Sequence, residues 1–188
     1  MPSSFAHIAA GIGLGTPALP DSIPRRYWMC AGFCAAIPDI DWLWSFRGRP
    51  YGHWLEHRGI THSLLFAACF AALITWTVLR PVAARGTLMR LWAGLTLATA
   101  SHGFFDALST YGAGVGFFIP FSTRRFFFPW RPISGSTGQS QSLALKVLVV
   151  LGKELLYVWL PSAAVACVVW WRRRAAMQQM RRQSVPET

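Results

Sequence analysis

Histidine and aspartate residues lie where apolar segments of the chain meet their loops, and they form three short signatures. These are Pro-Asp-Ile-Asp at positions 38–41, His-Arg-Gly-Ile-Thr-His-Ser at positions 57–63, and His102 with Asp106 four residues later. Ionisable groups in or beside apolar membrane segments are costly unless they have partners or a function. Imidazole and carboxylate groups gathered from several segments are the usual ligands of a hydrolytic metal ion. The signatures therefore predict a membrane metalloenzyme.

His102 and Asp106 are separated by one helical turn, so their side chains project from the same face of a helix. So placed, the imidazole and the carboxylate can hold one metal ion together, or the carboxylate can bridge two ions. A histidine that is only oriented by a neighbouring aspartate inside a helical bundle has the same spacing. The pair alone leaves both interpretations open.

Asp39 and Asp41 follow Pro38, which should break a helix. One of the two carboxylates can bind a metal ion directly while the other orients a histidine ligand. Ordinary acids at the membrane surface are the alternative interpretation. Because the chain has only seven acidic residues, two so close together favour a functional role.

His57 and His62 flank Gly59, which suits a turn, and Thr61, which suits the N-cap of the following helix. This arrangement predicts His62 on the first helical turn and His57 on the loop that leads to it. A chance pair of loop histidines is the alternative. His7, in the first apolar segment, is a weaker candidate ligand, because a lone histidine in a first helix is more often structural.

Two further acidic residues are candidates for catalysis. Glu154 can act as a general base or as a ligand, and a salt bridge with an arginine is equally compatible with its position. His53, Glu56 and His57 match the reversed zinc-protease motif H-x-x-E-H, in which both histidines face one way on a helix. Glycines on either side of the motif disfavour a long helix there, so a membrane metalloprotease is kept only as an alternative.

The composition is that of a membrane protein. Hydrophobic residues make up 53% of the chain and charged residues 13%, and the mean hydropathy is +0.35. Ten tryptophans and thirteen phenylalanines suit contact with lipid and headgroups. The formal net charge of +11 is compatible with a nucleic-acid partner, but most of the excess is arginine at the ends of apolar runs, which membrane orientation explains better. The cysteines fall inside apolar segments, and we expect no disulfides.

Hydropathy and periodicity predict an all-α fold, an integral membrane bundle of about five apolar helices. The first helix is short and Gly-rich, and the second is interrupted by a proline. The last apolar run exceeds what one span needs, and we expect it to divide into a helix outside the membrane or at its interface (143–154) and a span ending at position 171. The expected segments are 5–19, 27–44, 62–79, 91–109 and 143–171.

Arginine placement predicts the orientation. With strictly alternating spans, ten basic residues lie on one side and eight on the other, and the ten occupy the shorter loops. The positive-inside rule then places the N-terminus outside and the C-terminus inside a bacterial inner membrane, with no removable signal peptide. Every candidate ligand falls in the outer leaflet, facing the periplasm. Residues 1–171 form the expected membrane-embedded hydrolase domain and residues 172–188 a basic cytoplasmic tail.

An early histidine, P-D-x-D, H-R-G-x-T-H-S and H-x-x-x-D, in this order, resemble the YdjM family of LexA-regulated inner-membrane proteins. The resemblance spans roughly residues 5–135, and H-R-G-x-T-H-S before an apolar helix is its most specific part. The family is described as predicted metal-dependent hydrolases. It is grouped with zinc-dependent phospholipase C and the fungal single-strand nucleases, which are helical enzymes that cleave phosphoesters with clustered zinc ions.

The resemblance implies metal ligands in all three signatures, with Asp106 as the natural bridge between two ions. It also implies a basic pair, Arg124 and Arg125, in the last outer loop. The chain lacks the later histidine pair that completes the three-metal cluster of the soluble relatives. We therefore expect one or two divalent ions, Zn²⁺ in the first place and Mn²⁺ as the alternative. The implied ligands are His7, Asp39 or Asp41, His57 or His62, His102 and Asp106.

The chemistry that needs these residues is hydrolysis of a phosphoester by metal-activated water. Bound Zn²⁺ lowers the pKa of its water from about 15.7 to about 7, and the cation offsets charge that builds on the phosphoryl oxygens. A site in the outer leaflet suits a lipid or lipid-linked substrate, and nucleic acid is not expected as a partner. A non-catalytic protein with a structural metal ion and a transporter are the other classes considered. The candidate catalytic residues are Asp41, Glu154, Arg124 and Arg125.

The arginines of the last outer loop have two interpretations. Arg124, Arg125 and Arg131 can hold a phosphate, since a guanidinium offers paired donors to its oxygens. The loop's phenylalanines and Trp130 would then lie in the membrane interface beside them. Simple anchoring to lipid headgroups explains the same arginines equally well.

Overall fold

The computed structural model describes residues 3–19, 23–45, 53–84, 86–133 and 142–183. Helices make up the regular structure of these residues, and strand pairing is limited to two isolated bridges, Ser109 with Ile133 and Val115 with Phe126. The all-helical expectation is thereby confirmed for the described part of the chain.

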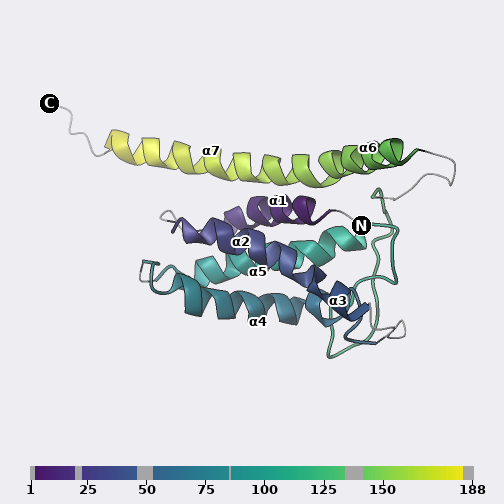
Figure 1. Ribbon diagram of the computed structural model, residues 1–188. Helices are drawn as coiled ribbons and strands as arrows, with labels where there is room; N and C mark the ends of the chain where they lie inside the picture. Colours follow the sequence, from purple (N-terminus) through teal and green to yellow (C-terminus); the bar gives the residue numbers. More distant parts are fainter. Residues whose placement is uncertain (1–2, 20–22, 46–52, 85, 134–141, 184–188) are drawn as a thin grey trace.

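Four helices form a bundle: α1 (Ser4–Gly15), α2 (Arg26–Ala36), α4 (Leu64–Ile74) and α5 (Leu88–Ala107). α5 lies in the middle and packs against the other three, as Figure 1 shows. Close approach of α1 depends on its glycines, because a Cβ added at Gly11 would lie 2.4 Å from the Cβ of Ala35. The small residues expected from the Gly-rich first segment thus allow this packing.

The second apolar segment changes its helical form at Pro38. The proline has no N–H to donate and its ring crowds the preceding turn, so α2 ends at Ala36 and a 3-10 helix, η2 (Ile37–Asp41), follows. A short helix, α3 (Trp42–Ser45), completes the segment. The tighter winding of η2 carries both aspartates of the Pro-Asp-Ile-Asp signature.

The N-cap of the third helix lies two residues after the expected one. Residues Ile60–His62 form a 3-10 turn (η3), and the N-cap of α4 is Ser63, whose Oγ accepts a hydrogen bond from Phe66 N at 3.1 Å. The expectation that Thr61 caps this helix is wrong, because the Thr61 hydroxyl is used elsewhere. After α4 the helix continues as a π-helical turn, η4 (Thr75–Leu79).

The last apolar run is one continuous helix. α6 (Leu143–Glu154), a π-helical turn η5 (Leu155–Trp159) and α7 (Leu160–Gln183) follow one another without a break. The helix is unbroken at position 154, where its form changes from α to π, and the expected division there into an interfacial part and a span stays a prediction. The helix also extends beyond position 171, so much of the expected tail is helical. The extra residue of the π turn keeps buried residues 154, 158 and 162 on one face.

This long helix runs parallel to α1 and covers it on the side away from α4 (Figure 1). Ser3 at the start of α1 bonds Glu154, and Gly13 lies against Ser162, where a Cβ would meet the Ser162 carbonyl oxygen at 2.6 Å. Farther along, the Arg173 guanidinium donates to the Leu19 carbonyl. The two helices are thus joined at both ends and in the middle.

Among the described residues, one helix, Ala144–Gln179, is long and apolar enough to cross a membrane, and 17% of its most apolar window is buried. The helix Leu64–Leu79 is apolar but shorter. α1 has 12 residues, fewer than the ~20 that a separate span needs. Helix length and hydropathy thus bear out one of the five expected spans, and the number of crossings stays a proposal.

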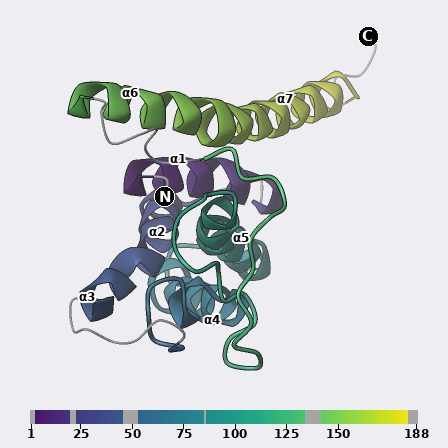
Figure 2. The same cartoon turned by 90° about the vertical axis from the view of Figure 1, so that its right-hand side faces the viewer.

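The direction of the four bundle helices places the chemical signatures together. α1 and α4 begin, and α2 and α5 finish, at the same end of the bundle, which we call the histidine end because His7, His62 and His102 lie there. Figure 2 looks onto this end, where the segment after α5 wraps over the bundle. The opposite end is an apolar core that includes Leu19, Tyr27, Leu79, Leu91 and Leu95.

Candidate metal centre

Two groups of candidate ligands meet at the histidine end. His7, His102 and Asp106 form one group, and in it one ligand atom from each residue lies within 4.8 Å of the others. The second group has the same compactness and consists of Asp39, His57 and His62. Each bundle helix or the turn beside it thus contributes at least one candidate ligand.

The two groups are in contact and form a single centre. His102 Nε2 lies 3.2 Å from Asp39 Oδ1, and His62 Nε2 lies 3.4 Å from Asp106 Oδ2. His7 Nε2 lies 3.7 Å from the other Asp106 oxygen, Oδ1. The Asp106 carboxylate therefore faces histidines of both groups. This is the position expected for a carboxylate that bridges two ions.

Aromatic packing fixes the planes of the histidine rings. The rings of His7 and His102 stack with centroids 3.6 Å apart and planes 10° apart. The His62 ring meets that of His102 edge-on at 4.8 Å, and the His57 ring meets that of His62 edge-on at 5.4 Å. Ring orientation across the centre is thus set by direct contact between histidines from different elements.

Several polar atoms of the centre are buried without a hydrogen bond among the described residues. They are both ring nitrogens of His7, Nε2 of His57, Nε2 of His62 and both carboxylate oxygens of Asp106. A buried polar atom left unpaired costs about 1–3 kcal/mol, and native proteins pair nearly all of them. Imidazole nitrogens and carboxylate oxygens that converge in this way are the donor set of Zn²⁺ and related divalent ions. The residues fit a bound cation.

Asp41 orients two of the candidate histidine ligands through their Nδ1 atoms. Its carboxylate lies 2.7 Å from His57 Nδ1 and 3.1 Å from His62 Nδ1, and it accepts hydrogen bonds from Thr61 Oγ1 at 2.6 Å and Arg58 N at 3.1 Å. Holding both Nδ1–H groups leaves both Nε2 lone pairs directed at the centre. Of the two aspartates in the signature, Asp39 belongs to a ligand group and Asp41 supports it.

His102 is held in the same tautomer by the backbone. Its Nδ1 donates to the Ala35 carbonyl oxygen at 2.7 Å, so Nε2 is left with its lone pair toward Asp39 and Asp106. That carbonyl lies near the end of α2, where its helical partner is lost. Two acceptors, one carboxylate and one carbonyl, therefore set the ligand atoms of three histidines.

Burial differs between the two groups. His7, His102 and Asp106 are completely buried, whereas the side chains of His57 and Asp39 are 19% and 15% exposed. The centre therefore opens on the side of His57 and Asp39. Solvent therefore reaches the centre on this side.

Arg58 is a residue of the centre that sequence reasoning did not select. Its buried side chain places Nε 3.1 Å from Asp106 Oδ2, donates from Nη2 to Ser109 Oγ at 3.0 Å and donates from Nη1 to the Tyr111 carbonyl. Its backbone has φ 65°, an uncommon value for a residue other than glycine. Its position between His57 and Gly59, inside the His-Arg-Gly-Ile-Thr-His-Ser signature, could have marked it as a residue of the centre. Arginine counting alone assigned it to an outer loop.

Arg124 and Arg125 point in different directions. Arg125 Nη2 pairs with Glu56 at 2.6 Å, and the same guanidinium donates to the carbonyls of His53 and His57. It therefore holds two loops together. Arg124 is exposed, with its guanidinium 5.5 Å from the centre of the Phe126 ring. The expected phosphate-binding pair is not presented as a pair.

The geometry does not support the protease alternative. Residues 53–59 form turns, so the histidines of H-x-x-E-H lack the shared helix face that the motif requires. Glu56, the expected base, is paired with Arg125. His53 Nδ1 accepts a hydrogen bond from Leu55 N at 3.1 Å, and only His57 of the three belongs to a ligand group.

Glu154, the last residue of α6, lies against the start of α1. Its two carboxylate oxygens accept hydrogen bonds from Ser3 N at 2.6 Å and from Ser3 Oγ at 2.8 Å. A buried carboxylate at a helix N-terminus is stabilised by the helix dipole. Glu154 belongs to neither ligand group, and its contacts are those of an anchor between the last helix and the first.

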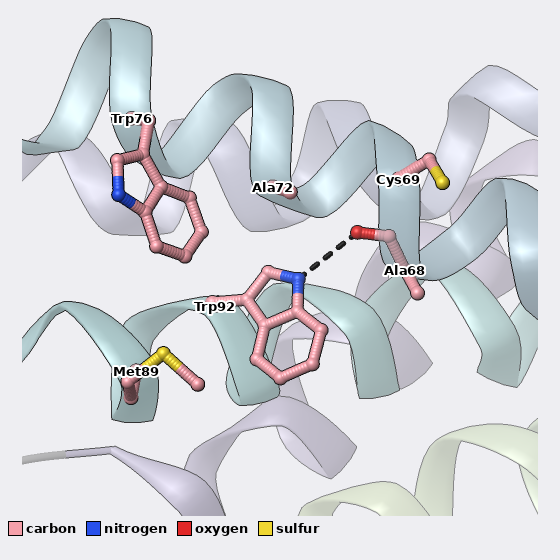
Figure 3. A pocket seen from close by; sticks show the side chains of 6 residues that line it. All are labelled: Ala68, Cys69, Ala72, Trp76, Met89 and Trp92. Carbon is pink, nitrogen blue, oxygen red and sulfur yellow. Dashed lines mark hydrogen bonds between the residues drawn. The ribbon is translucent and has the colours of Figure 1, made fainter.

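A separate apolar cavity of about 280 Å³ lies between α4 and α5 (Figure 3). Trp92 Nε1 donates to the Ala68 carbonyl oxygen at 2.9 Å (Figure 3). Trp92 is ten residues before His102, about 15 Å along the helix. The cavity is therefore not part of the metal centre. It is lined by Ala68, Cys69, Ala72, Trp76, Met89 and Trp92.

Comparison with known proteins agrees with the membrane character of the chain. Residues 1–178 match the model of the family described as YdjM inner membrane protein. The chain is 36% identical over 176 residues to the inner membrane protein YbcI of Escherichia coli (strain K12), a match that covers 90% of this chain and 98% of that protein. No solved structure matches the chain. With nearly its whole length matched and the histidine signatures gathered at one end of its bundle, the chain belongs to the YdjM family of inner membrane proteins.

Proposed function

We propose that the chain is a membrane-embedded metal-dependent hydrolase that cleaves a phosphoester of a lipid or lipid-linked substrate. The observation that carries the proposal is the convergence, on one point of the bundle, of buried His7, His62 and Asp106 atoms that have no hydrogen bond among the described residues. Native proteins pair nearly all of their buried polar atoms, so a cluster of imidazole and carboxylate atoms without hydrogen bonds supports a bound cation. The inner membrane family supplies the location, and the donor set supplies the chemistry.

The two ligand groups would have different roles. His7, His102 and Asp106 would hold an inner ion, and Asp39, His57 and His62 an outer one. When bound, a divalent ion supplies a water of lowered pKa and a positive charge for the phosphoryl oxygens. Asp41 keeps the outer histidines in the tautomer that ligation needs, and the exposed side of His57 and Asp39 admits the substrate.

The charges of the centre favour an anionic substrate. With neutral histidines, Asp39, Asp41 and Asp106 carry three negative charges against the positive charge of Arg58. One divalent ion balances the remaining two negative charges. A second ion leaves two positive charges, which a hydroxide and the anionic oxygen of a phosphodiester would offset.

The proposed membrane topology rests on the difference between the histidine end and the opposite end of the bundle. We propose a multi-pass topology with the N-terminus outside, so that the histidine end faces the periplasm. Arg25, Arg26, Arg80 and Arg90 border the other ends of the bundle helices, in agreement with a cytoplasmic location of that end. Residues 1–171 would form the embedded hydrolase and residues 172–188 its basic cytoplasmic end, helical as far as Gln183.

Elemental analysis of the purified protein tests the proposal. Wild type should retain one or two zinc or manganese ions per chain, and His102→Ala and Asp106→Asn should lose at least one of them. His53→Ala, a histidine outside both groups, is the matched control and should retain the wild-type content. Hydrolysis of phospholipids and of a soluble chromogenic phosphodiester should fall with the metal content. Stoichiometric metal in both ligand variants would exclude the centre.

Complete burial of the inner group favours a second role for one ion. A structural metal site is closed, whereas a catalytic site keeps an open position, and His7, His102 and Asp106 are fully buried. An inner ion that only joins α1 to α5 is therefore the alternative for that group. His57→Ala should then abolish hydrolysis and leave one ion bound, whereas His7→Ala should lower the thermal stability.

A further inference from the structure

Residues Phe117–Arg131, which we call the aromatic loop, are fixed to the histidine end of the bundle. Val115 and Phe126 exchange backbone hydrogen bonds of 2.9 and 3.0 Å, and Phe128 N donates to the Ala107 carbonyl at 3.0 Å. Leu64 N donates to the Phe117 carbonyl, also at 3.0 Å. The loop is thus held by the end of α5 and the start of α4, and its backbone runs across this end of the bundle (Figure 2).

That outer surface is aromatic. Phe121 is 82% exposed and Trp130 is 62% exposed, and Phe118 and Phe127 are exposed as well. Several large apolar side chains exposed close together in one segment mark a contact with another apolar phase or partner. The loop therefore does not have a surface suited to bulk water.

The same surface carries positive charge. The Arg124 guanidinium lies over the Phe126 ring, and the Arg131 guanidinium lies 4.8 Å from the centre of the Phe127 ring. The sequence has no acidic residue between Asp106 and Glu154. A guanidinium that lies over a ring can still offer its N–H donors to the oxygens of a phosphate.

A contact with the last helix indicates the depth of the aromatic loop relative to a bilayer. The Trp130 ring meets the Tyr157 ring edge-on at 5.3 Å. Tyr157 lies near the start of the charge-free stretch 155–171 of the helix that can cross a membrane. These 17 residues span about 26 Å, close to the hydrocarbon thickness of ~30 Å. Trp130 and Tyr157 therefore lie at one edge of the apolar layer, where such rings are enriched.

We propose that the aromatic loop lies in the headgroup layer of the bilayer, with its exposed rings at the acyl boundary and Arg124 and Arg131 bound to the phosphates of anionic phospholipids. A membrane headgroup satisfies both chemistries of the surface at once, the apolar rings and the guanidinium groups. A soluble anion would leave the rings exposed. This interaction does not require the metal centre to be catalytic.

The loop would also bring lipid phosphates close to the centre. Gly116 N donates to the Arg58 carbonyl at 2.9 Å, so the start of the loop touches the residue that pairs with Asp106. If the centre is a hydrolase, a step that rests on the proposed function, its substrate enters from the headgroup layer. The loop then selects lipid phosphoesters over soluble ones.

Fluorescence of the full-length protein in phosphatidylglycerol nanodiscs tests the placement of the loop. Subtracting the spectrum of Trp130→Phe from that of wild type isolates the emission of Trp130. Lipids brominated on acyl carbons near the headgroup should quench this difference signal more strongly than lipids brominated near the chain end. Quenching by aqueous iodide together with no quenching by brominated lipid would overturn the proposal.

The arginines are tested by the same signal. Replacing phosphatidylcholine by phosphatidylglycerol should increase the lipid quenching of Trp130, and Arg124→Gln with Arg131→Gln should remove that increase. Titration with phosphatidylglycerol in mixed micelles should show binding weakened about fivefold per arginine. Arg172→Gln with Arg174→Gln removes the same charge at the other end of the last helix and should leave the Trp130 signal unchanged.

Two further measurements distinguish the proposal from a site for soluble phosphate and from the proposed hydrolase function. Millimolar inorganic phosphate should not change the Trp130 quenching, and its displacement of the lipid would identify a site for soluble phosphate instead. Metal content should be the same in wild type, Trp130→Phe and the arginine pair variant. A normal Trp130 signal in a protein that binds no metal would refute the hydrolase and leave the membrane placement of the loop intact.

Discussion

The guanidinium of Arg58 and the carboxylate of Asp106 meet at 3.1 Å inside the bundle, where both side chains are buried. One carboxylate oxygen is thereby directed by Arg58 and the other faces His7. Arg58 also donates its backbone N–H to Asp41, so one residue contacts both the candidate bridging carboxylate and the carboxylate that orients the outer histidines. Its left-handed backbone conformation places N–H and side chain on these two partners at once.

Arg58→Met should destabilise the protein strongly, because it leaves the Asp106 carboxylate buried without its cation. Breaking a buried ion pair costs about 3–5 kcal/mol. Arg58→Lys keeps the charge but loses the forked contacts to Ser109 and Tyr111, and should be intermediate. Thermal unfolding in detergent, without added metal, measures the order of the variants. Arg124→Met is the exposed control, and equal melting temperatures for both methionine variants would contradict the assignment.

Asp41→Asn should weaken metal binding while the bundle still folds. An amide cannot accept from both Nδ1–H groups as the carboxylate does, so the tautomers of His57 and His62 are no longer fixed. Loss of such an orienting group typically costs 10–100-fold in metal affinity. Competition with a chromogenic chelator gives the affinity. Thr61→Val, which removes one hydrogen bond to Asp41, should have a smaller effect, and a larger loss than in Asp41→Asn would be inconsistent with this role.

Glu154→Gln should lower stability without changing metal content. The charged acceptor for Ser3 N and Ser3 Oγ is lost, and hydrogen bonds to a charged group contribute about 1.5–3 kcal/mol. Thermal unfolding and elemental analysis of the same preparation separate the two effects. Ser3→Ala removes one of the two donors and should show part of the stability loss. Loss of bound metal in Glu154→Gln would place the carboxylate at the centre after all.

Removal of metal should lower the melting temperature, and acid should release the ion. A ligand that binds only the folded state stabilises it by mass action. Imidazole and carboxylate ligands bind only after losing their protons, so occupancy falls as pH falls. Dialysis against a chelator, followed by return of Zn²⁺ or Mn²⁺, measures the shift and identifies the preferred ion. A smaller shift in His102→Ala than in wild type under the same treatment is the expected control result, because this variant lacks a ligand of the inner group.

Much of the site could be predicted from the chain because helix geometry fixes its strongest part. His102 and Asp106 project from one face of α5 by spacing alone, and Pro38 forces the change of helical form that presents Asp39. The outer positions of the signatures predicted their meeting at one end. Hydropathy and turn signals likewise located the apolar helices within a few residues of their observed limits, except that the last helix extends to Gln183.

The remaining assignments depend on contacts that no local pattern encodes. Arg124 and Arg125 are neighbours of the same type, and only the bridge between Val115 and Phe126 decides which one turns inward. The choice between Asp39 and Asp41 depends on where residues 57–62 pack against η2. The continuity of the last helix depends on a π turn, whose single extra residue leaves no clear mark in the periodicity.

The contacts that join α1 to the last helix have a consequence for biogenesis. α1, which carries His7, is synthesised well before Glu154 and Arg173, the residues through which the last helix contacts the two ends of this segment. The long helix can therefore cover α1 only after the rest of the bundle has been made.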